Sequence, residues 1–245
     1  MPGLIVRREN ISPDNSNVIL LIPGHPSGKA NGEPLNDLID KNSYQKGLAI
    51  ELAENGYVVF CMGLRGFSTD SDLDSVGFEA IASMKSYSWY GFLTSDALLI
   101  AQTIAHECEI DRDSIGIVGL STGGGVAMFA SSFEKFSWAI VAGFFGSFSH
   151  NFVHEIHSYS GNINGILKYV EMADFVIASL PQRIAIINGK YDTFGYENAQ
   201  YHYELVRKVY SEYGHYDSIS FHVPDVGHEY DVELILRLVA EFEKL

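Results

Sequence analysis

Cysteine is scarce in this chain, which has only Cys61 and Cys108 among its 245 residues. Two cysteines cannot form a disulfide framework in a chain of this length, and both lie among apolar residues, so we expect reduced thiols in the core. Long hydrophobic runs are also missing, since no segment approaches the roughly 18 apolar residues of a membrane span. Residues 1–8 contain no apolar signal-peptide core, and we therefore expect a cytoplasmic protein.

Basic residues are few as well. The 16 lysines and arginines stand against 31 aspartates and glutamates, which gives a formal net charge of −15. Nucleic acids and anionic membranes require basic patches, so neither is an expected partner. The acidic residues are scattered, which favours a role in solubility over an acidic tail, and no internal repeat or low-complexity segment is present. The length and the 47% hydrophobic content predict one globular domain over residues 1–245, and leave a homo-oligomer open.

The most informative stretch of the chain is residues 114–127. It begins with an apolar run at residues 115–118, short enough for a buried strand, and passes through Gly119-Leu120-Ser121-Thr122-Gly123 into small residues compatible with a helix. This is the G-x-S-x-G pattern in its required context of strand, sharp turn and helix. Glycines flank the serine because the chain must fold back closely around a strained backbone. The pattern predicts an exposed Ser121 hydroxyl at a helix N-terminus, where negative charge is favoured.

Two further polar residues follow predicted strands in the order that complements such a serine. Asp192 comes after an apolar strand at residues 183–188, and His228 comes after a strand at residues 218–223. The carboxyl ends of parallel strands share one edge of a sheet, so we expect Ser121, Asp192 and His228 to meet there. A weak nucleophile such as serine needs a histidine to take its proton, and an acid to hold that histidine in the right tautomer. The chain therefore predicts a Ser-Asp-His catalytic triad, which requires no metal and no organic cofactor.

The loop after the apolar strand at residues 18–22 is the expected partner for the negative charge that forms during such a reaction. It reads Pro23-Gly24-His25-Pro26. The backbone N–H groups of His25 and Thr122 are the candidate oxyanion hole, whereas Pro26 has no N–H to donate. A loop histidine without a special role is the alternative for His25.

Strands and helices alternate along the chain, which predicts a three-layer α/β architecture with a mostly parallel sheet and helices on both faces. Besides those already given, the predicted strands are residues 4–8, 56–62 and 138–144, and the predicted helices are residues 44–55, 93–107, 197–213 and 231–244. Residues 70–88 are predicted to be less regular.

The long stretch at residues 145–180 is the candidate for a lid or a pocket wall, because long insertions between strands are usually functional. The candidate pocket residues are Trp89, Phe145 and Tyr159, which would suit an apolar or sugar-stacking substrate, although core positions are the alternative. The histidines of this stretch (His150, His154 and His157) lack a recognised zinc spacing, so we expect loop or pocket histidines and no metal site. Arg65 follows another strand and either pins its loop or contacts substrate.

With these motifs placed, the chain resembles the α/β-hydrolase family over nearly its whole length, and within it the branch of dienelactone hydrolases and acetyl-xylan-esterase-like proteins. The segments that carry the resemblance are residues 56–59, 65–67, 111–116, 157–174, 183–192 and 227–229 together with the serine motif. The resemblance implies an α/β-hydrolase fold with about seven strands, the triad Ser121, Asp192 and His228, and hydrolysis of carboxylic esters with small acyl groups. The loop at residues 23–26 departs from the family's usual pattern.

The leading functional hypothesis is a serine esterase acting on a small or medium acyl ester. A serine peptidase of the prolyl-oligopeptidase type has the same triad order, but the chain has no propeller-like repeats. A catalytically inactive α/β-hydrolase that serves as a binding protein is the third hypothesis, which the intact triad disfavours and the altered oxyanion loop keeps open.

Overall fold

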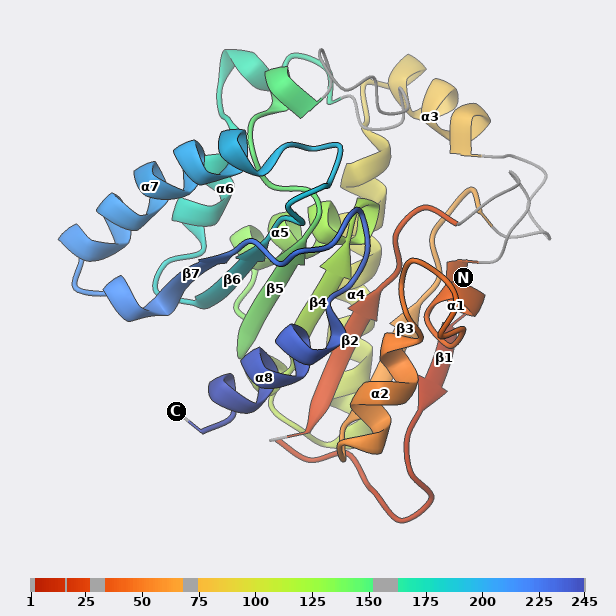
Figure 1. Cartoon of the computed structure of the whole chain (residues 1–245). Coiled ribbons are helices and arrows are strands. Elements are labelled where there is room, and N and C mark those ends of the chain that lie inside the picture. The colour runs from red at the N-terminus through yellow and green to blue at the C-terminus, as the bar shows by residue number, and fades with distance from the viewer. Residues whose placement is uncertain (1–2, 16, 27–33, 68–74, 152–162, 245) are drawn as a thin grey trace.

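A seven-stranded sheet lies between two layers of helices (Figure 1). The computed structural model describes residues 3–15, 17–26, 34–67, 75–151 and 163–244. The strands are β1 (Gly3–Val6), β2 (Val18–Ile22), β3 (Val58–Met62), β4 (Gly116–Leu120), β5 (Trp138–Ala142), β6 (Arg183–Ile187) and β7 (Ile219–His222). Their order is β1-β3-β2-β4-β5-β6-β7, and only β1 runs antiparallel to its neighbour. The predicted fold class and strand number are confirmed, and β7 lies at an edge of the sheet.

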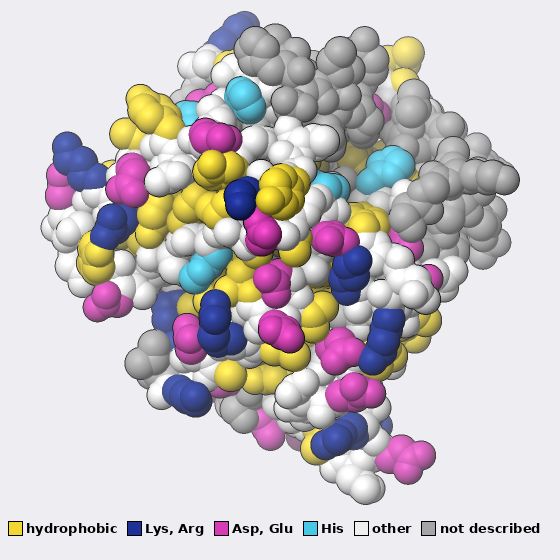
Figure 2. All heavy atoms as spheres, viewed as in Figure 1, with side chains coloured by type: hydrophobic (Ala, Val, Ile, Leu, Met, Phe, Trp, Pro, Cys, Tyr) yellow, Lys and Arg dark blue, Asp and Glu magenta, His cyan; other side chains and the backbone are white. Residues whose placement is uncertain are grey.

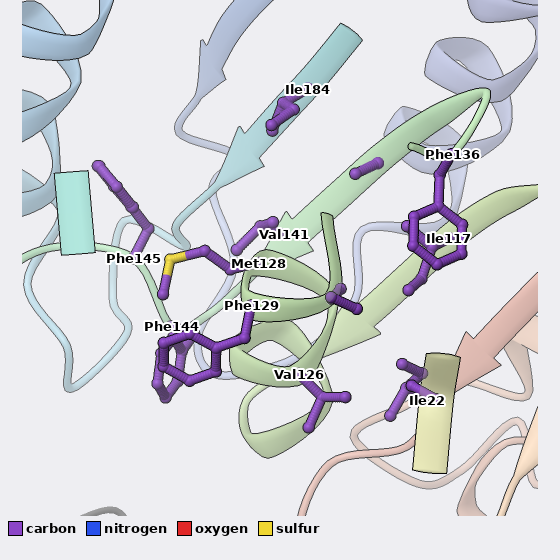
Figure 3. Close-up of a cluster of buried hydrophobic side chains, with 14 of the residues drawn as sticks. Ile22, Ile117, Val126, Met128, Phe129, Phe136, Val141, Phe144, Phe145 and Ile184 are labelled. Carbon is purple, nitrogen blue, oxygen red and sulfur yellow. The ribbon is translucent and has the colours of Figure 1, made fainter. Parts of the chain in front are cut away.

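Both faces of the sheet are covered, which explains why the central strands are apolar throughout. In β2 the side chains of Val18, Leu20 and Ile22 belong to one core cluster, while Ile19 and Leu21 belong to the other. The first cluster packs against α4 (Trp89–Cys108), α5 (Thr122–Phe133), α6 (Met172–Ala178) and α7 (Tyr196–Glu212). The second packs against α2 (Leu48–Glu54) and α8 (Val232–Phe242). Figure 3 shows side chains of the first cluster around α5, among them Ile117, Val126, Phe129 and Phe144.

Local capping moves several helix ends away from their predicted positions. Helix α4 begins four residues before the predicted residue 93, because the Ser88 hydroxyl accepts a hydrogen bond from the Gly91 N–H at 2.9 Å and caps the first turn. Helix α2 begins at Leu48, because Gly47 before it has φ 63° and is not helical. Two short elements, α1 (Pro34–Asp37) and α3 (Ser75–Met84), were not predicted, and α3 lies in the stretch expected to be less regular.

The described part of the 145–180 stretch packs into the helical layer. Helix α6 buries Met172, Ala173 and Val176. The ring of Phe175 lies edge-on to that of Phe129 in α5, with centroids 4.8 Å apart. The Glu171 carboxylate accepts hydrogen bonds from the N–H groups of Met172 at 3.0 Å and Phe148 at 2.8 Å. These contacts fix both ends of the stretch to the core, and its role as a lid or pocket wall stays a prediction.

The surface carries charges of both signs. Acidic and basic side chains are interspersed over the face formed by α2, α7 and α8 (Figure 2). Within the described ranges, the helices are all too short or too polar to cross a bilayer.

Candidate active site

Ser121 occupies a sharp turn between β4 and α5. Its backbone has φ 59° and ψ −122°, a conformation that side-chain-bearing residues rarely adopt. The flanking glycines are required by close contact, because a Cβ atom on Gly119 would lie 2.0 Å from the Gly123 carbonyl oxygen. A Cβ atom on Gly123 would lie 2.1 Å from the carbonyl oxygen of Ile22 in β2. The turn predicted from the G-x-S-x-G pattern is therefore present, and its glycines are needed for the reason expected. The expectation of an exposed Ser121 is corrected, because Ser121 is only 6% exposed with the loop at Gly24 lying against it.

Asp192 and His228 form a hydrogen-bonded pair. The Asp192 Oδ2 atom lies 2.9 Å from the His228 Nδ1 atom. Its other oxygen, Oδ1, accepts a hydrogen bond from the Phe194 N–H at 3.0 Å. The Asp192 side chain is 1% exposed and the His228 side chain 26%. A buried carboxylate held in this way orients the imidazole and favours the tautomer with a proton on Nδ1, in which Nε2 is the nitrogen that can accept a proton.

The sheet brings the serine segment and the Asp192–His228 pair to the same edge. The Ser121 N–H donates to the Ala142 carbonyl at 2.9 Å, and the Gly143 N–H donates to the Ile187 carbonyl at 2.8 Å. Gly143, with φ +56°, lies where the segments meet. A Cβ atom on Gly143 would be 2.9 Å from Leu120 Cδ1, 3.2 Å from Asp192 Oδ2 and 3.2 Å from His228 Cε1. The positive φ and these close spacings favour glycine at the point where the serine strand, the acid and the histidine meet.

Both candidate oxyanion donors belong to segments next to Ser121. Thr122 is the first residue of α5, where the leading N–H groups have no acceptor within the helix. The loop at residues 24–25 lies directly against the serine, since a Cβ atom on Gly24 would be 3.2 Å from Ser121 Cβ. The His25 imidazole packs edge-on to Phe67, with ring centroids 4.6 Å apart.

Two of the three candidate pocket residues, Trp89 and Phe145, occupy buried positions. Trp89 is 1% exposed, and its Nε1–H donates to the Arg65 carbonyl at 3.0 Å. Phe145 is fully buried, and Tyr159 lies outside the described residues (Figure 3). Trp89 also packs edge-on to Phe67, the residue that supports the His25 ring. Trp89 thus supports the candidate oxyanion loop through Phe67, and a contact with substrate stays a prediction.

Arg65 forms a bidentate ion pair with Asp96 in α4. Its Nη2 atom lies 2.7 Å from Asp96 Oδ1, and its Nε atom donates to Oδ2. The Asp96 side chain is 8% exposed, and the hydrogen bonds to this carboxylate raise the pKa of the Arg65 guanidinium above its ordinary value. This geometry favours the structural reading of Arg65, in which it pins its loop to α4.

The histidines of the 145–180 stretch are only partly described. His150 lies near Gly195, since a Cβ atom on that glycine would be 3.4 Å from His150 Nε2, whereas His154 and His157 fall outside the described residues. Within the described part of the chain, no three His, Cys, Asp or Glu side chains are grouped so as to hold a metal ion.

Sequence reasoning did not identify Tyr44 and Gln45 as residues of the site. The Tyr44 ring stacks on the His228 ring with centroids 6.0 Å apart, and the Gln45 side chain accepts a hydrogen bond from the Gly24 N–H at 3.0 Å. Neither contact has a signal in the sequence, because the two residues precede a helix and reach loops that lie 20 or more residues away.

Comparison with known proteins supports the fold. No protein-family model matches this sequence, and no curated protein sequence is significantly similar to it. Solved structures resemble it over nearly its whole length. A Bacteroides fragilis protein provisionally named an acetyl xylan esterase is 16% identical with a TM-score of 0.76, and the match covers 98% of this chain and 74% of that one. A carbohydrate esterase family 15 glucuronoyl esterase from Caldicellulosiruptor kristjansonii is 16% identical with a TM-score of 0.68, covering 99% and 71%.

A third similar structure is the acylaminoacyl peptidase of Pyrococcus horikoshii, at 14% identity with a TM-score of 0.63. This match covers 94% of the present chain and 36% of the peptidase. The chain therefore has the α/β-hydrolase fold, and its structural neighbours include the branch suggested by the sequence.

Proposed function

We propose that this protein is a serine hydrolase that cleaves a carboxylic ester of a small or medium acyl group through a covalent acyl-enzyme. The observation that carries the proposal is the hydrogen bond of 2.9 Å between Asp192 and His228 at the sheet edge where Ser121 occupies its strained turn. We would not expect a turn aspartate and a loop histidine without catalytic roles to form a hydrogen bond at the sheet edge that carries such a serine. Strain of this kind is typical of functional sites.

The reaction would proceed in two halves. Nε2 of His228 accepts the hydroxyl proton of Ser121 as the serine oxygen attacks the ester carbonyl carbon. The tetrahedral intermediate collapses when the carbon–oxygen bond to the alcohol breaks and His228 returns the proton to that alcohol. Water then attacks the acyl-enzyme by the same route and releases the acid. Asp192 stabilises the imidazolium in both halves while remaining a carboxylate.

The negative charge on the carbonyl oxygen would be stabilised by the backbone N–H groups of Thr122 and His25. The N-terminus of α5 adds a favourable dipole at the same place. Every group that this mechanism needs belongs to the chain itself.

Labelling with a fluorophosphonate tests the proposal. We expect one adduct per molecule, located on Ser121 by peptide mass spectrometry, together with turnover of short-chain nitrophenyl esters. Ser121→Ala and His228→Ala should lose the adduct and several orders of magnitude in ester turnover. Ser131→Ala is the matched control, because Ser131 is a buried serine, at 3% exposure, in α5, the helix that follows Ser121. A folded wild-type protein that takes no adduct and turns over no ester refutes the proposal and favours an inactive hydrolase acting as a binding protein.

A peptidase is the second candidate, and the similarity to the acylaminoacyl peptidase favours it. Rates on an ester and an amide with the same acyl group separate the two functions. Faster cleavage of the aminoacyl amide would identify a peptidase.

A further inference from the structure

Two consecutive residues outside the predicted triad, Tyr44 and Gln45, contact the loop at residues 24–25. The Tyr44 hydroxyl donates a hydrogen bond to the His25 carbonyl, and the Gln45 Oε1 atom accepts one from the Gly24 N–H at 3.0 Å. We infer that Tyr44 and Gln45 are positioning residues that hold the His25 N–H in place as an oxyanion donor, an inference that rests on the proposed esterase function.

The order of peptide units in the loop explains why these two bonds matter. The Gly24 N–H belongs to the peptide unit before Gly24, and the His25 carbonyl belongs to the unit after His25. The unit between them carries the His25 N–H, so both neighbouring units are held by hydrogen bonds, and among the described residues this N–H donates to no other group. Pro26 cannot replace this donor, because it has no N–H.

Burial of the Gln45 amide is unfavourable for folding unless its hydrogen bond to the loop compensates. It is fully buried, and its Nε2 atom has no hydrogen-bond partner among the described residues. An unsatisfied buried donor costs free energy that an apolar side chain of similar volume would avoid. The bond from Oε1 to the Gly24 N–H is thus the physical reason to have an amide at this position.

Tyr44 fits tightly against the same loop. A Cβ atom on Gly24 would lie 2.2 Å from the Tyr44 hydroxyl oxygen, so this hydroxyl fills the space beside Gly24. Burial raises the pKa of the Tyr44 hydroxyl far above its ordinary value, and the group therefore remains a donor over the whole range in which the enzyme would act.

The same segment also contacts the loop that carries His228. The Tyr44 carbonyl accepts a hydrogen bond from the Tyr230 N–H at 3.1 Å, and the Tyr44 and His228 rings stack at an interplanar angle of 12°. The next residue, Lys46, forms an ion pair of 2.6 Å with Glu229. Residues 44–46 therefore connect the candidate oxyanion loop to the histidine loop and set the distance between them.

Tyr44→Phe and Gln45→Met test the inference, because each keeps the volume of the side chain and removes one bond to the loop. An oxyanion donor acts on the transition state, so we expect kcat for ester hydrolysis to fall by about 10- to 100-fold in each variant while KM changes by less than about 3-fold. The rate of fluorophosphonate labelling at Ser121 should fall in parallel, because the phosphoryl oxygen would occupy the same donors.

Tyr210→Phe is the matched control. It removes a buried tyrosine hydroxyl that donates to the Val176 carbonyl at 3.1 Å and lies near the start of β6, whereas the candidate site lies beyond the carboxyl end of that strand. We expect it to lower thermal stability about as much as Tyr44→Phe and to leave kcat unchanged.

Three outcomes are distinguishable. A lower kcat in Tyr44→Phe and Gln45→Met, in proteins as folded as Tyr210→Phe, supports the inference. Wild-type kcat in both variants, or a loss confined to KM, overturns it while the wild-type adduct on Ser121 keeps the proposed function intact. A folded wild type with neither adduct nor turnover refutes the proposed function, and the positioning role with it.

Discussion

Replacing Asp192 by asparagine is the sharpest test of the proposed chemistry, because the structure determines which way the new amide must point. The Phe194 N–H donates to Asp192 Oδ1 at 3.0 Å and needs an acceptor there. In Asp192→Asn the amide oxygen must therefore face Phe194, and the NH₂ group must face His228 Nδ1. The flipped amide, rotated by 180°, would place its NH₂ group against the Phe194 N–H, so that two buried donors would face each other without an acceptor.

The consequence for His228 is a change of tautomer. A donor at Nδ1 forces that nitrogen to accept, so the proton moves to Nε2, the atom that should take the proton of Ser121. The variant also loses the negative charge that stabilises the imidazolium. Together these effects predict a fall in kcat of roughly 10⁴-fold, about 5.5 kcal/mol of transition-state stabilisation.

Steady-state hydrolysis of a short-chain nitrophenyl ester provides the measurement. Intact-protein mass spectrometry should accompany it. Deamidation of the introduced asparagine in even a trace of the sample would regenerate wild-type enzyme, whose activity would mask the low residual activity of the variant. Asp225→Asn is the matched control. It makes the same substitution in a side chain that is 73% exposed and paired with Lys190 at 2.8 Å, and it should leave kcat within about 2-fold.

A kcat within about 10-fold of wild type in a folded, undeamidated Asp192→Asn protein would refute the reasoning. It would mean that the hydrogen bond between Asp192 and His228 does not control the state of the imidazole. A thermal unfolding curve separates this result from simple loss of the fold.

Two further predictions concern stability. Gly123→Ala places a Cβ atom 2.1 Å from the Ile22 carbonyl oxygen. We therefore expect the free energy of unfolding, measured by urea denaturation, to fall by about 2–4 kcal/mol, even though alanine favours a helix. An unchanged denaturation midpoint would contradict the close approach. Burial raises the pKa of the Cys61 thiol from 9.0 to about 12, so above pH 9 the unfolded chain loses this proton before the folded protein does, and stability falls as the pH rises. Between pH 8 and pH 10.5 the free energy of unfolding, measured by urea denaturation, should fall by about 2 kcal/mol more for the wild type than for Cys61→Ala. Equal decreases would show that the thiol is accessible in the folded protein.

The strands and the serine turn could be predicted from the sequence because their signals are local. An apolar run such as residues 18–22 in β2 can be predicted as a strand from its own residues, since both faces of the strand are buried and carry apolar side chains. The glycines at positions 119 and 123 mark a turn that no larger residue could make. The order of Ser121, Asp192 and His228, each after a strand, was enough to predict that they share one edge of the sheet.

Contacts between distant segments were decided by the tertiary structure alone. Arg65 meets Asp96, 31 residues away, and Gln45 meets Gly24, 21 residues away. Hydrogen bonds of this kind carry no periodicity, because they depend on where a loop and its partner segment lie after the sheet has formed. The start of α4 is different, because its cap is a local contact between Ser88 and Gly91, three residues apart. The sequence thus determined which residues could do the chemistry, and packing of the sheet and loops determined which residues hold them in place.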